Sequence, residues 1–207
     1  MVDWTLILLF IPTFFLVSIS PGMCMTLAMT LGMTIGFRRT LSMMWGEVIG
    51  VATIAIAAMI GVAAIMLRYP EIFAVVKYGG GAYLVYLGVQ MWRSRGKMAI
   101  NLDNPKEANL KGYELAWQGF MTAIANPKGW AFFVVLLPKF MNLELSLHTQ
   151  IVSIVMVIVV IELFCMCLYA GGGKMLRLFL ERSGNIAIMN RISGTLMVAV
   201  GIWLALS

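Results

Sequence analysis

One short polar motif interrupts an apolar stretch in the second half of the chain. Asn126, Pro127 and Lys128 lie between long runs of apolar residues. Proline removes a helix hydrogen bond, so a helix that begins after Pro127 presents free N–H groups and a positive dipole end. Such an end binds anions, for example the carboxylate of an amino acid, and Lys128 adds a positive charge. The alternative is a packing kink, with Lys128 extended to a membrane interface.

A matching motif, Ser20-Pro21-Gly22, interrupts the first apolar run. Proline and glycine together weaken a helix at this point. The motif carries no charge, so any contact with a ligand comes from backbone groups or from the Ser20 hydroxyl. The alternative is again a simple kink.

Two acidic residues, Glu47 and Glu162, lie inside other apolar runs. A carboxylate in lipid costs several kcal/mol, so each is expected to face the protein interior. There it can bind the ammonium group of a substrate. It can also carry a proton, because burial favours the neutral form of a carboxyl group. The alternatives are a structural pair with Lys128 or, for Glu47, a place at the membrane interface.

The composition places these residues in a membrane protein. The chain has 207 residues, of which 61% are hydrophobic and 12% charged, and its mean hydropathy is +0.93. Soluble domains are about half apolar and about a quarter charged. These values exclude a disordered chain, a disulfide mini-protein and an ordinary cytosolic enzyme. The net charge of +6 comes from residues in the gaps between apolar runs, so we interpret it as a topology signal rather than as a nucleic-acid surface.

The chain offers few residues for cofactor or metal chemistry. His148 is the only histidine, and no phosphate loop or zinc motif is present. We therefore expect no cofactor, no metal and no enzymatic activity. The N-terminus lacks a basic region and a cleavage site, so a removed signal peptide is not expected. The three cysteines lie inside apolar runs, which is poor evidence for a disulfide framework; they are Cys24, Cys165 and Cys167.

The apolar runs predict six transmembrane helices, since each has at least the length of about 20 residues that a span needs. The two proline motifs break the first and the fourth of these helices. Gly171-Gly172-Gly173 is expected to end the fifth helix. The segment Met175–Arg182 after it resembles a short interfacial helix. Gly32-x-x-x-Gly36 and Gly46-x-x-x-Gly50 predict close helix contacts. The runs cover residues 4–35, 41–67, 72–92, 115–140, 151–170 and 186–206.

The distribution of Lys and Arg predicts the orientation. Loops one, three and five with their flanks hold 11 of the 15 basic residues, and the opposite side holds 3. Basic loops face the cytoplasm. Both termini are then expected outside it, and residues 93–114 form a cytoplasmic loop.

The two halves of the chain share a plan. Pro21 and Pro127 are 106 residues apart, and Glu47 and Glu162 lie in the second run of each half. Three helices per half is an odd number, so the halves insert with opposite orientations, as in many secondary transporters whose broken helices mark the binding site. We predict a single all-α membrane domain over residues 1–207, with inverted repeats at 1–92 and 115–207.

Several stretches together resemble the LysE/RhtB family of amino-acid exporters. They are Ser20-Pro21-Gly22, residues 79–88, Asn126-Pro127-Lys128 with Phe132-Phe133, and residues 190–194 with Gly201. They occur in the family's order along nearly the whole chain. The region around Tyr83 and the glutamate of the fifth run are most similar to the leucine and neutral amino-acid branch.

The resemblance implies a six-helix carrier of the bacterial inner membrane that exports amino acids, driven by the proton gradient. The family's Pro-Gly motif corresponds to Pro21 and Gly22, and its Asn-Pro-Lys motif to Asn126, Pro127 and Lys128. One departure concerns the first motif, where the family continues with a second proline and this chain has Met23. The first break is therefore expected to be less rigid.

Two other hypotheses compete with amino-acid export. One is a channel for small solutes or a membrane scaffold that transports nothing. The other is a thiol-disulfide electron carrier, suggested by Cys24 close after Pro21; it lacks a partner thiol at the second break. The sequence leaves open the amino acid, the coupling ion and whether the chain forms a homo-oligomer.

Overall fold

The computed structural model describes the chain except residues 1–2, 94–109, 143, 182–184 and 207. The predicted cytoplasmic loop therefore lies largely outside the described residues. The described part is helical and contains no strand, as predicted. Its helices are α1 (Trp4–Ile19), α2 (Met23–Thr34), α3 (Phe37–Arg68), α4 (Pro70–Arg93), α5 (Gly112–Ile124), α6 (Pro127–Leu136), the 3-10 helix η2 (Leu137–Phe140), α7 (Leu147–Glu181) and α8 (Asn185–Leu206).

Both proline motifs break a helix, as predicted. The axes of α1 and α2 differ by 57° across the first motif, and the axis of α5 differs by 53° from that of the segment Pro127–Phe140 across the second. The second half-helix begins at Pro127 itself, in the first position of α6. Proline is favoured there, since its fixed φ suits a helix and its missing N–H would have no partner inside the helix.

Two helices are long and apolar enough to cross a membrane alone, over Phe37–Ile65 of α3 and Leu147–Gly173 of α7. Each broken pair counts as a further span when its halves are taken together, which gives up to four in the described residues. α8 has a shorter apolar stretch, Ala187–Trp203. α4 contains several glycine and tyrosine residues and Lys77, which lower its mean hydropathy. The structure thus supports two to four of the six predicted spans.

The three consecutive glycines end the apolar span of α7, as predicted, because the stretch that can cross a membrane runs from Leu147 to Gly173. Gly173 leaves helical geometry, with φ 27° and ψ −108°, and a second helical segment continues from it to Glu181. That positive φ favours glycine and kinks the helix there. The predicted interfacial helix Met175–Arg182 falls on the last turns of α7, whose side chains lie mostly outside the described residues.

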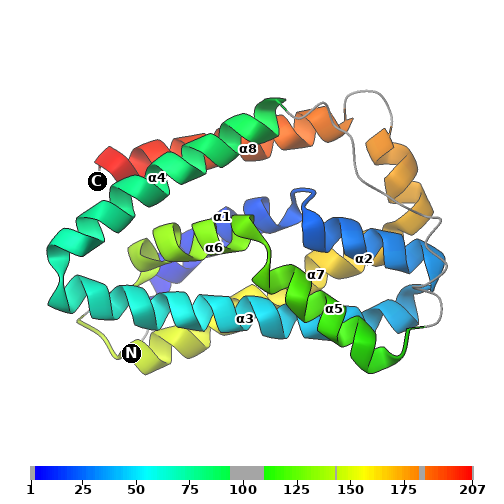
Figure 1. Ribbon diagram of the computed structural model, residues 1–207, viewed down its shortest axis with the longest axis horizontal. Coiled ribbons are helices and arrows are strands. Elements are labelled where there is room, and N and C mark those ends of the chain that lie inside the picture. The colour runs from blue at the N-terminus through cyan, green and yellow to red at the C-terminus, as the bar shows by residue number, and fades with distance from the viewer. Residues whose placement is uncertain (1–2, 94–109, 143, 182–184, 207) are drawn as a thin grey trace.

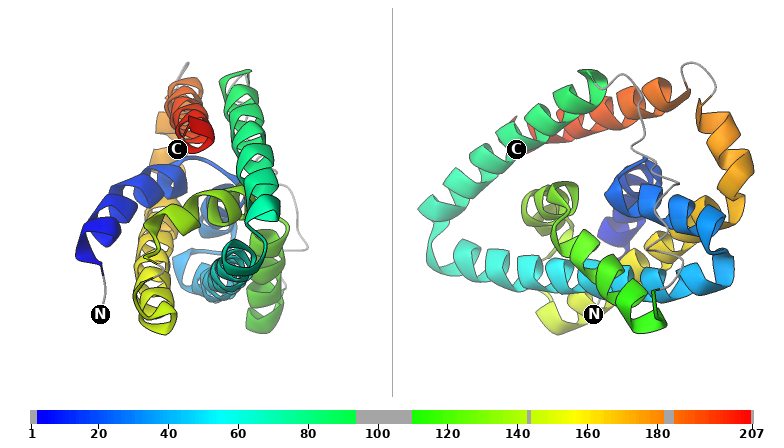
Figure 2. Two further views of the ribbon diagram at one scale, coloured as in Figure 1. Left: turned by 90° about the vertical axis from the view of Figure 1, so that its left-hand side faces the viewer. Right: turned by 45° about the vertical axis from the view of Figure 1, so that its right-hand side comes forward.

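The helices form a core and a side layer. Each long helix packs against the broken pair of the other half, α3 against α5 and α6, and α7 against α1 and α2. α4 and α8 pair closely with each other and run along one edge of the molecule, opposite α3 (Figures 1 and 2). This side layer contacts the core mainly through α6 and α3.

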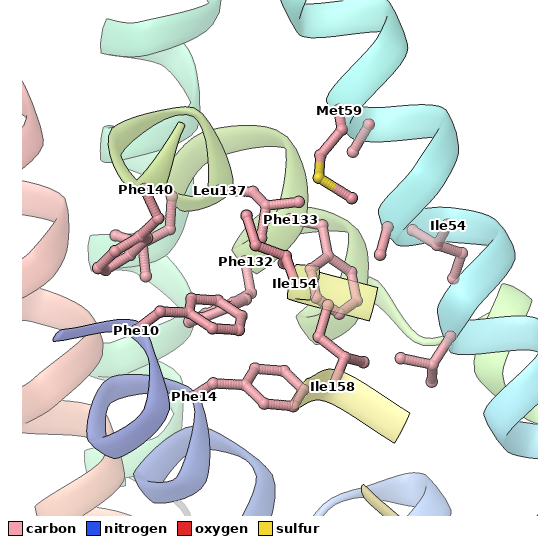
Figure 3. Packing of buried hydrophobic residues seen from close by; sticks show 14 of the residues in the cluster. Phe10, Phe14, Ile54, Met59, Phe132, Phe133, Leu137, Phe140, Ile154 and Ile158 are labelled. Carbon is pink, nitrogen blue, oxygen red and sulfur yellow. The ribbon is translucent and has the colours of Figure 1, made fainter. Parts of the chain in front are cut away.

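Aromatic side chains from α1 and α6 interlock in the core (Figure 3). The Phe14 ring lies 5.4 Å from that of Phe132 and 5.8 Å from that of Phe133, measured between centroids. On the outer surface, Leu8 and Val160 are more than half exposed, as expected for side chains that contact lipid.

Three of the four predicted packing glycines make close contacts. Gly32 lies against the Ala170 backbone, Gly46 against the Ala116 backbone, and Gly50 against Phe120 and Ala123. Gly36 is different, because it has φ 83° and lies in the turn before α3. Its prediction as a packing residue was wrong; its conformation is the left-handed one that favours glycine.

Candidate functional site

Asn126 organises the second break. Its side-chain Oδ1 accepts a hydrogen bond from the Lys128 backbone N–H at 3.1 Å and thereby caps α6. Asparagine is among the preferred residues at this position, because its oxygen satisfies an N–H that lacks a helical partner. The side-chain Nδ2 donates to the Cys24 sulfur at 3.6 Å, in the first turn of α2. One side chain therefore joins the two breaks.

The Lys128 ammonium group makes a second connection between the breaks. It donates to the Val17 carbonyl at 2.5 Å, to the Ser20 carbonyl at 3.4 Å and to the Ser20 hydroxyl. A lysine has three donors, so these oxygens use all of them. The carbonyls lie at the C-terminal end of α1, where the helix dipole is negative and attracts a cation. Lys128 thus points into the protein, which contradicts the alternative of a side chain extended to the membrane interface.

A cavity of about 40 Å³ lies beside this connection. Residues from α1, α2, α3, α5, α6 and α7 contribute to its wall. One water molecule requires about 10–15 Å³ of cavity volume. The cavity therefore holds a few atoms rather than an amino acid. Six of the eight predicted site residues line it: Ser20, Gly22, Glu47, Asn126, Lys128 and Glu162. We call it the inner cavity.

Both buried glutamates face the inner cavity. Glu47 is 1% exposed and Glu162 is 8% exposed, so Glu47 is an interior residue and not an interfacial one. Oε2 of each carboxyl group makes no hydrogen bond of good geometry within the described residues. The Ser18 hydroxyl lines the same cavity and lies close enough to the Glu162 carboxyl group to interact with it. Glu162 is near enough to Lys128 for an electrostatic interaction.

A larger space, which we call the outer groove, lies between the two breaks and the α4–α8 layer. Its volume is about 300 Å³, at the lower end of the range for small-molecule sites. Pro21 and Pro127, the two predicted residues that do not line the inner cavity, line this groove. The other lining residues are Gly22, Met23, Leu87, Gln90, Met91, Asn126, Lys128, Asn190 and Met197.

The two spaces share part of their walls. Gly22, Asn126 and Lys128 line both of them. The Lys128 side chain therefore stands between a groove large enough for a small solute and a cavity that contains two acids. This geometry suits a small zwitterion, whose carboxylate meets Lys128 and the α6 N-terminus and whose ammonium meets a glutamate.

Several residues of these walls were not among the predicted site residues. Ser18 and Cys24 line the inner cavity, and Gln90 and Asn190 line the outer groove. A serine in a membrane helix costs little free energy, so Ser18 gave no sign of function, and Cys24 was considered only for the thiol-disulfide alternative. The break at Pro21 offered one signal for Cys24, since it places the first turn of α2 next to the motif.

Comparison with known proteins identifies the family of the chain. The model of the LysE type translocator family matches residues 14–207. This chain belongs to that family. Members are translocators rather than enzymes, and the protein is a multi-pass membrane protein.

Three relatives match over nine-tenths or more of their own lengths. A homoserine/homoserine lactone efflux protein of Salmonella typhimurium is 26% identical over 190 residues, covering 92% of this chain and 91% of the relative. An uncharacterized membrane protein of Vibrio cholerae is 26% identical over 188 residues, covering 91% and 90%. The membrane protein YrhP of Bacillus subtilis is 22% identical over 207 residues, covering 97% and 99%. No solved structure matches the chain.

Proposed function

We propose that this protein is a secondary transporter of the bacterial inner membrane that exports small neutral amino acids from the cytoplasm in exchange for protons. The observation that carries the proposal is the meeting of two broken helices at one lysine, with two buried glutamates behind it. Broken helices near the centre of a membrane domain, with ionisable residues facing inwards, are typical of transporter binding sites. The homoserine efflux protein among the relatives supports an amino-acid substrate.

In this proposal the substrate enters the outer groove. Its carboxylate approaches the Lys128 ammonium and the N-terminus of α6, where Asn126 already holds the Lys128 N–H. To bind it, Lys128 exchanges hydrogen bonds with Val17 and Ser20 for bonds with the carboxylate. The ammonium group of the substrate is directed towards the carboxyl groups of the inner cavity. Glu162 carries the proton that is exchanged.

The packing supports two inverted repeats. Residues 1–92 and 115–207 each contain a broken helix, a long helix and a further helix, in the same order. The broken helix of each half packs on the long helix of the other half. Counting α4 and α8 as spans gives six, and the Lys and Arg distribution places both termini outside the cytoplasm. We propose this topology for the membrane.

Homoserine and homoserine lactone together test the proposed role of Lys128, because the lactone has an amino group but no carboxylate. The experiment is counterflow of each labelled compound into liposomes that contain the protein. We expect the wild type to exchange homoserine saturably. The variant Lys128→Met should lose homoserine exchange and keep exchange of the lactone, if the wild type carries it. Lys77→Met, on α4 outside both the inner cavity and the outer groove, serves as the control.

Two results would contradict the proposal. Homoserine exchange that is unchanged in Lys128→Met would show that the carboxylate does not bind there. Flux that does not saturate and shows no counterflow would indicate a channel instead. Proton coupling is tested separately with Glu162→Gln, which should lose transport driven by a pH gradient; full activity of that variant would exclude the role of Glu162.

A further inference from the structure

We propose that the inner cavity binds one small monovalent cation, in competition with the amino group of the substrate, so that each exported amino acid exchanges for a single positive charge. This inference rests on the proposed transport function and adds its charge stoichiometry. It follows from the charges that face the cavity, from the oxygens left without partners and from the volume.

The charges around the cavity do not balance. Among the described residues, the charged side chains in its wall are Glu47 from α3, Glu162 from α7 and Lys128 from α6. The other polar groups there are uncharged at neutral pH: the serine hydroxyls of α1, the Cys24 thiol of α2 and the Asn126 amide. The wall therefore carries a net charge of −1 when all three groups are ionised. An uncompensated buried charge is costly, so one further positive charge stabilises the site.

The available oxygens show where that charge binds. Glu47 Oε2 and Glu162 Oε2 make no hydrogen bond of good geometry within the described part of the chain, and the Ser18 hydroxyl lies beside the Glu162 carboxyl group. All three residues are more than nine-tenths buried and line the inner cavity. They come from three different helices, α3, α7 and α1. Lys128 already uses its three donors on the first break, so it leaves these oxygens free for another cation.

Two cations suit such oxygens. A proton transferred from water forms an O–H bond with one carboxylate oxygen, and that O–H then donates a hydrogen bond to a neighbouring oxygen; the proton returns to water when the site opens to the other side. A sodium ion is held by the same oxygens without covalent change. Either one contributes a single positive charge.

The volumes explain why the cation and the amino group exclude each other. The inner cavity of about 40 Å³ holds one small group with little water, whereas the outer groove of about 300 Å³ holds the rest of the substrate. The substrate's ammonium and the cation therefore compete for the same carboxylate oxygens. Mutual exclusion of this kind is the physical basis of one-for-one exchange. Either the cation or the substrate's ammonium group neutralises the site, and the two do not bind there together.

The test measures the charge moved by the wild-type protein in liposomes. A tenfold homoserine gradient is imposed with equal pH and equal sodium concentration on both sides, and a potassium gradient with valinomycin sets the membrane potential. The net homoserine flux should vanish at about 59 mV, the value for a tenfold ratio and one charge. A zero-flux potential near 30 mV, which indicates two charges, would overturn the inference, as would flux that does not respond to the potential.

Further measurements identify the cation and separate the two proposals. A pH gradient shifts the zero-flux potential if the cation is a proton, and a sodium gradient shifts it if the cation is Na⁺; if neither shifts it, the inference is wrong. Homoserine counterflow with a different charge number refutes only this inference. The absence of homoserine counterflow refutes the proposed function for this substrate and the inference with it.

Ser18 provides a test at the level of one ligand. Removing one hydroxyl ligand with Ser18→Ala should raise the cation concentration for half-maximal coupled transport by about two- to tenfold. The matched control is Ser153→Ala on α7, where the hydroxyl donates to the Thr149 carbonyl and does not line the cavity. If Ser18→Ala has a wild-type Tm and an unchanged cation concentration for half-maximal transport, Ser18 is not a ligand and the proposed cation site is wrong.

Discussion

Substitutions of Asn126 separate two properties of the second break, its helix cap and its charge. The Asn126 Oδ1 accepts the Lys128 N–H at 3.1 Å, and the Nδ2 donates to the Cys24 sulfur at 3.6 Å. Asn126→Ala removes both bonds. Asn126→Ser keeps an uncharged capping oxygen. Asn126→Asp keeps a capping oxygen and adds a negative charge where we propose that the substrate carboxylate binds.

The cap determines the expected stabilities. Loss of a capping side chain costs about 0.5–2 kcal/mol. In a chain of this length about 1 kcal/mol lowers the Tm by about 2–4 °C, so Asn126→Ala should unfold a few degrees below the wild type in the same detergent. Serine and aspartate cap helices about as well as asparagine does. Asn126→Ser and Asn126→Asp should therefore keep nearly the wild-type Tm.

The charge determines the expected transport. Two like charges about 4 Å apart repel by about 4 kcal/mol at an effective dielectric constant of about 20. Homoserine counterflow by Asn126→Asp should therefore fall by about a hundredfold or more relative to Asn126→Ser, even if neighbouring Lys128 offsets part of the repulsion. Homoserine lactone has no carboxylate, so any exchange of the lactone should survive in both variants.

The comparison between aspartate and serine is the decisive result. Equal homoserine counterflow by the two folded variants would show that the carboxylate does not approach this end of α6. The proposed position of the substrate carboxylate would then be wrong, although the helix cap would stand if Asn126→Ala still had a lowered Tm.

Two further predictions concern packing and are checked by thermal unfolding. Gly46→Val should destabilise the protein by about 1–3 kcal/mol or more, because any Cβ at Gly46 meets the Ala116 carbonyl, whereas Gly61→Val should be tolerated, since no described atom lies within 4 Å of its Cβ; equal Tm values would refute the contact. Phe14→Ala should cost about 3–5 kcal/mol by opening a cavity in the aromatic cluster, and exposed Leu8→Ala should cost far less; a small loss for Phe14 would show that the cluster collapses around the gap.

The helix breaks could be predicted from the sequence because proline and glycine act on their own backbone. Pro127 removes a hydrogen bond whatever surrounds it, and the observed break lies at this residue. The bounds of α3, α4 and α8 also agree with the apolar runs to within a few residues. Such features depend on local chemistry and on the thickness of the bilayer.

The glycines show where local reasoning failed. Glycine permits a kink, a turn or a close contact, and the sequence does not distinguish among them. Gly173 ends the apolar span of α7, as predicted, whereas Gly36 forms a turn although its spacing from Gly32 indicated packing. The difference is made by neighbours far away in the sequence, such as Ala170 beside Gly32.

The candidate site was predictable to the extent that its residues are costly in lipid. Glu47, Glu162 and Lys128 stood out because a charged group in a membrane helix needs an interior environment. Ser18 has no such cost, and it became evident only when the structure placed its buried hydroxyl beside the two acids in the inner cavity. The outer groove was not predicted, since it depends on the distance between the breaks and the α4–α8 layer.

Lys128 connects these observations to a transport cycle. Its ammonium holds the C-terminal end of α1 against the start of α6, so the two halves are joined at the point where they are proposed to move. On the proposed mechanism a substrate carboxylate replaces the Val17 and Ser20 oxygens as the partner of Lys128. The bond that orients the substrate then also releases α1 from Lys128. Substrate binding therefore favours the state in which one half can move against the other. A ligand without a carboxylate lacks this differential interaction, which is why homoserine and its lactone are the informative pair.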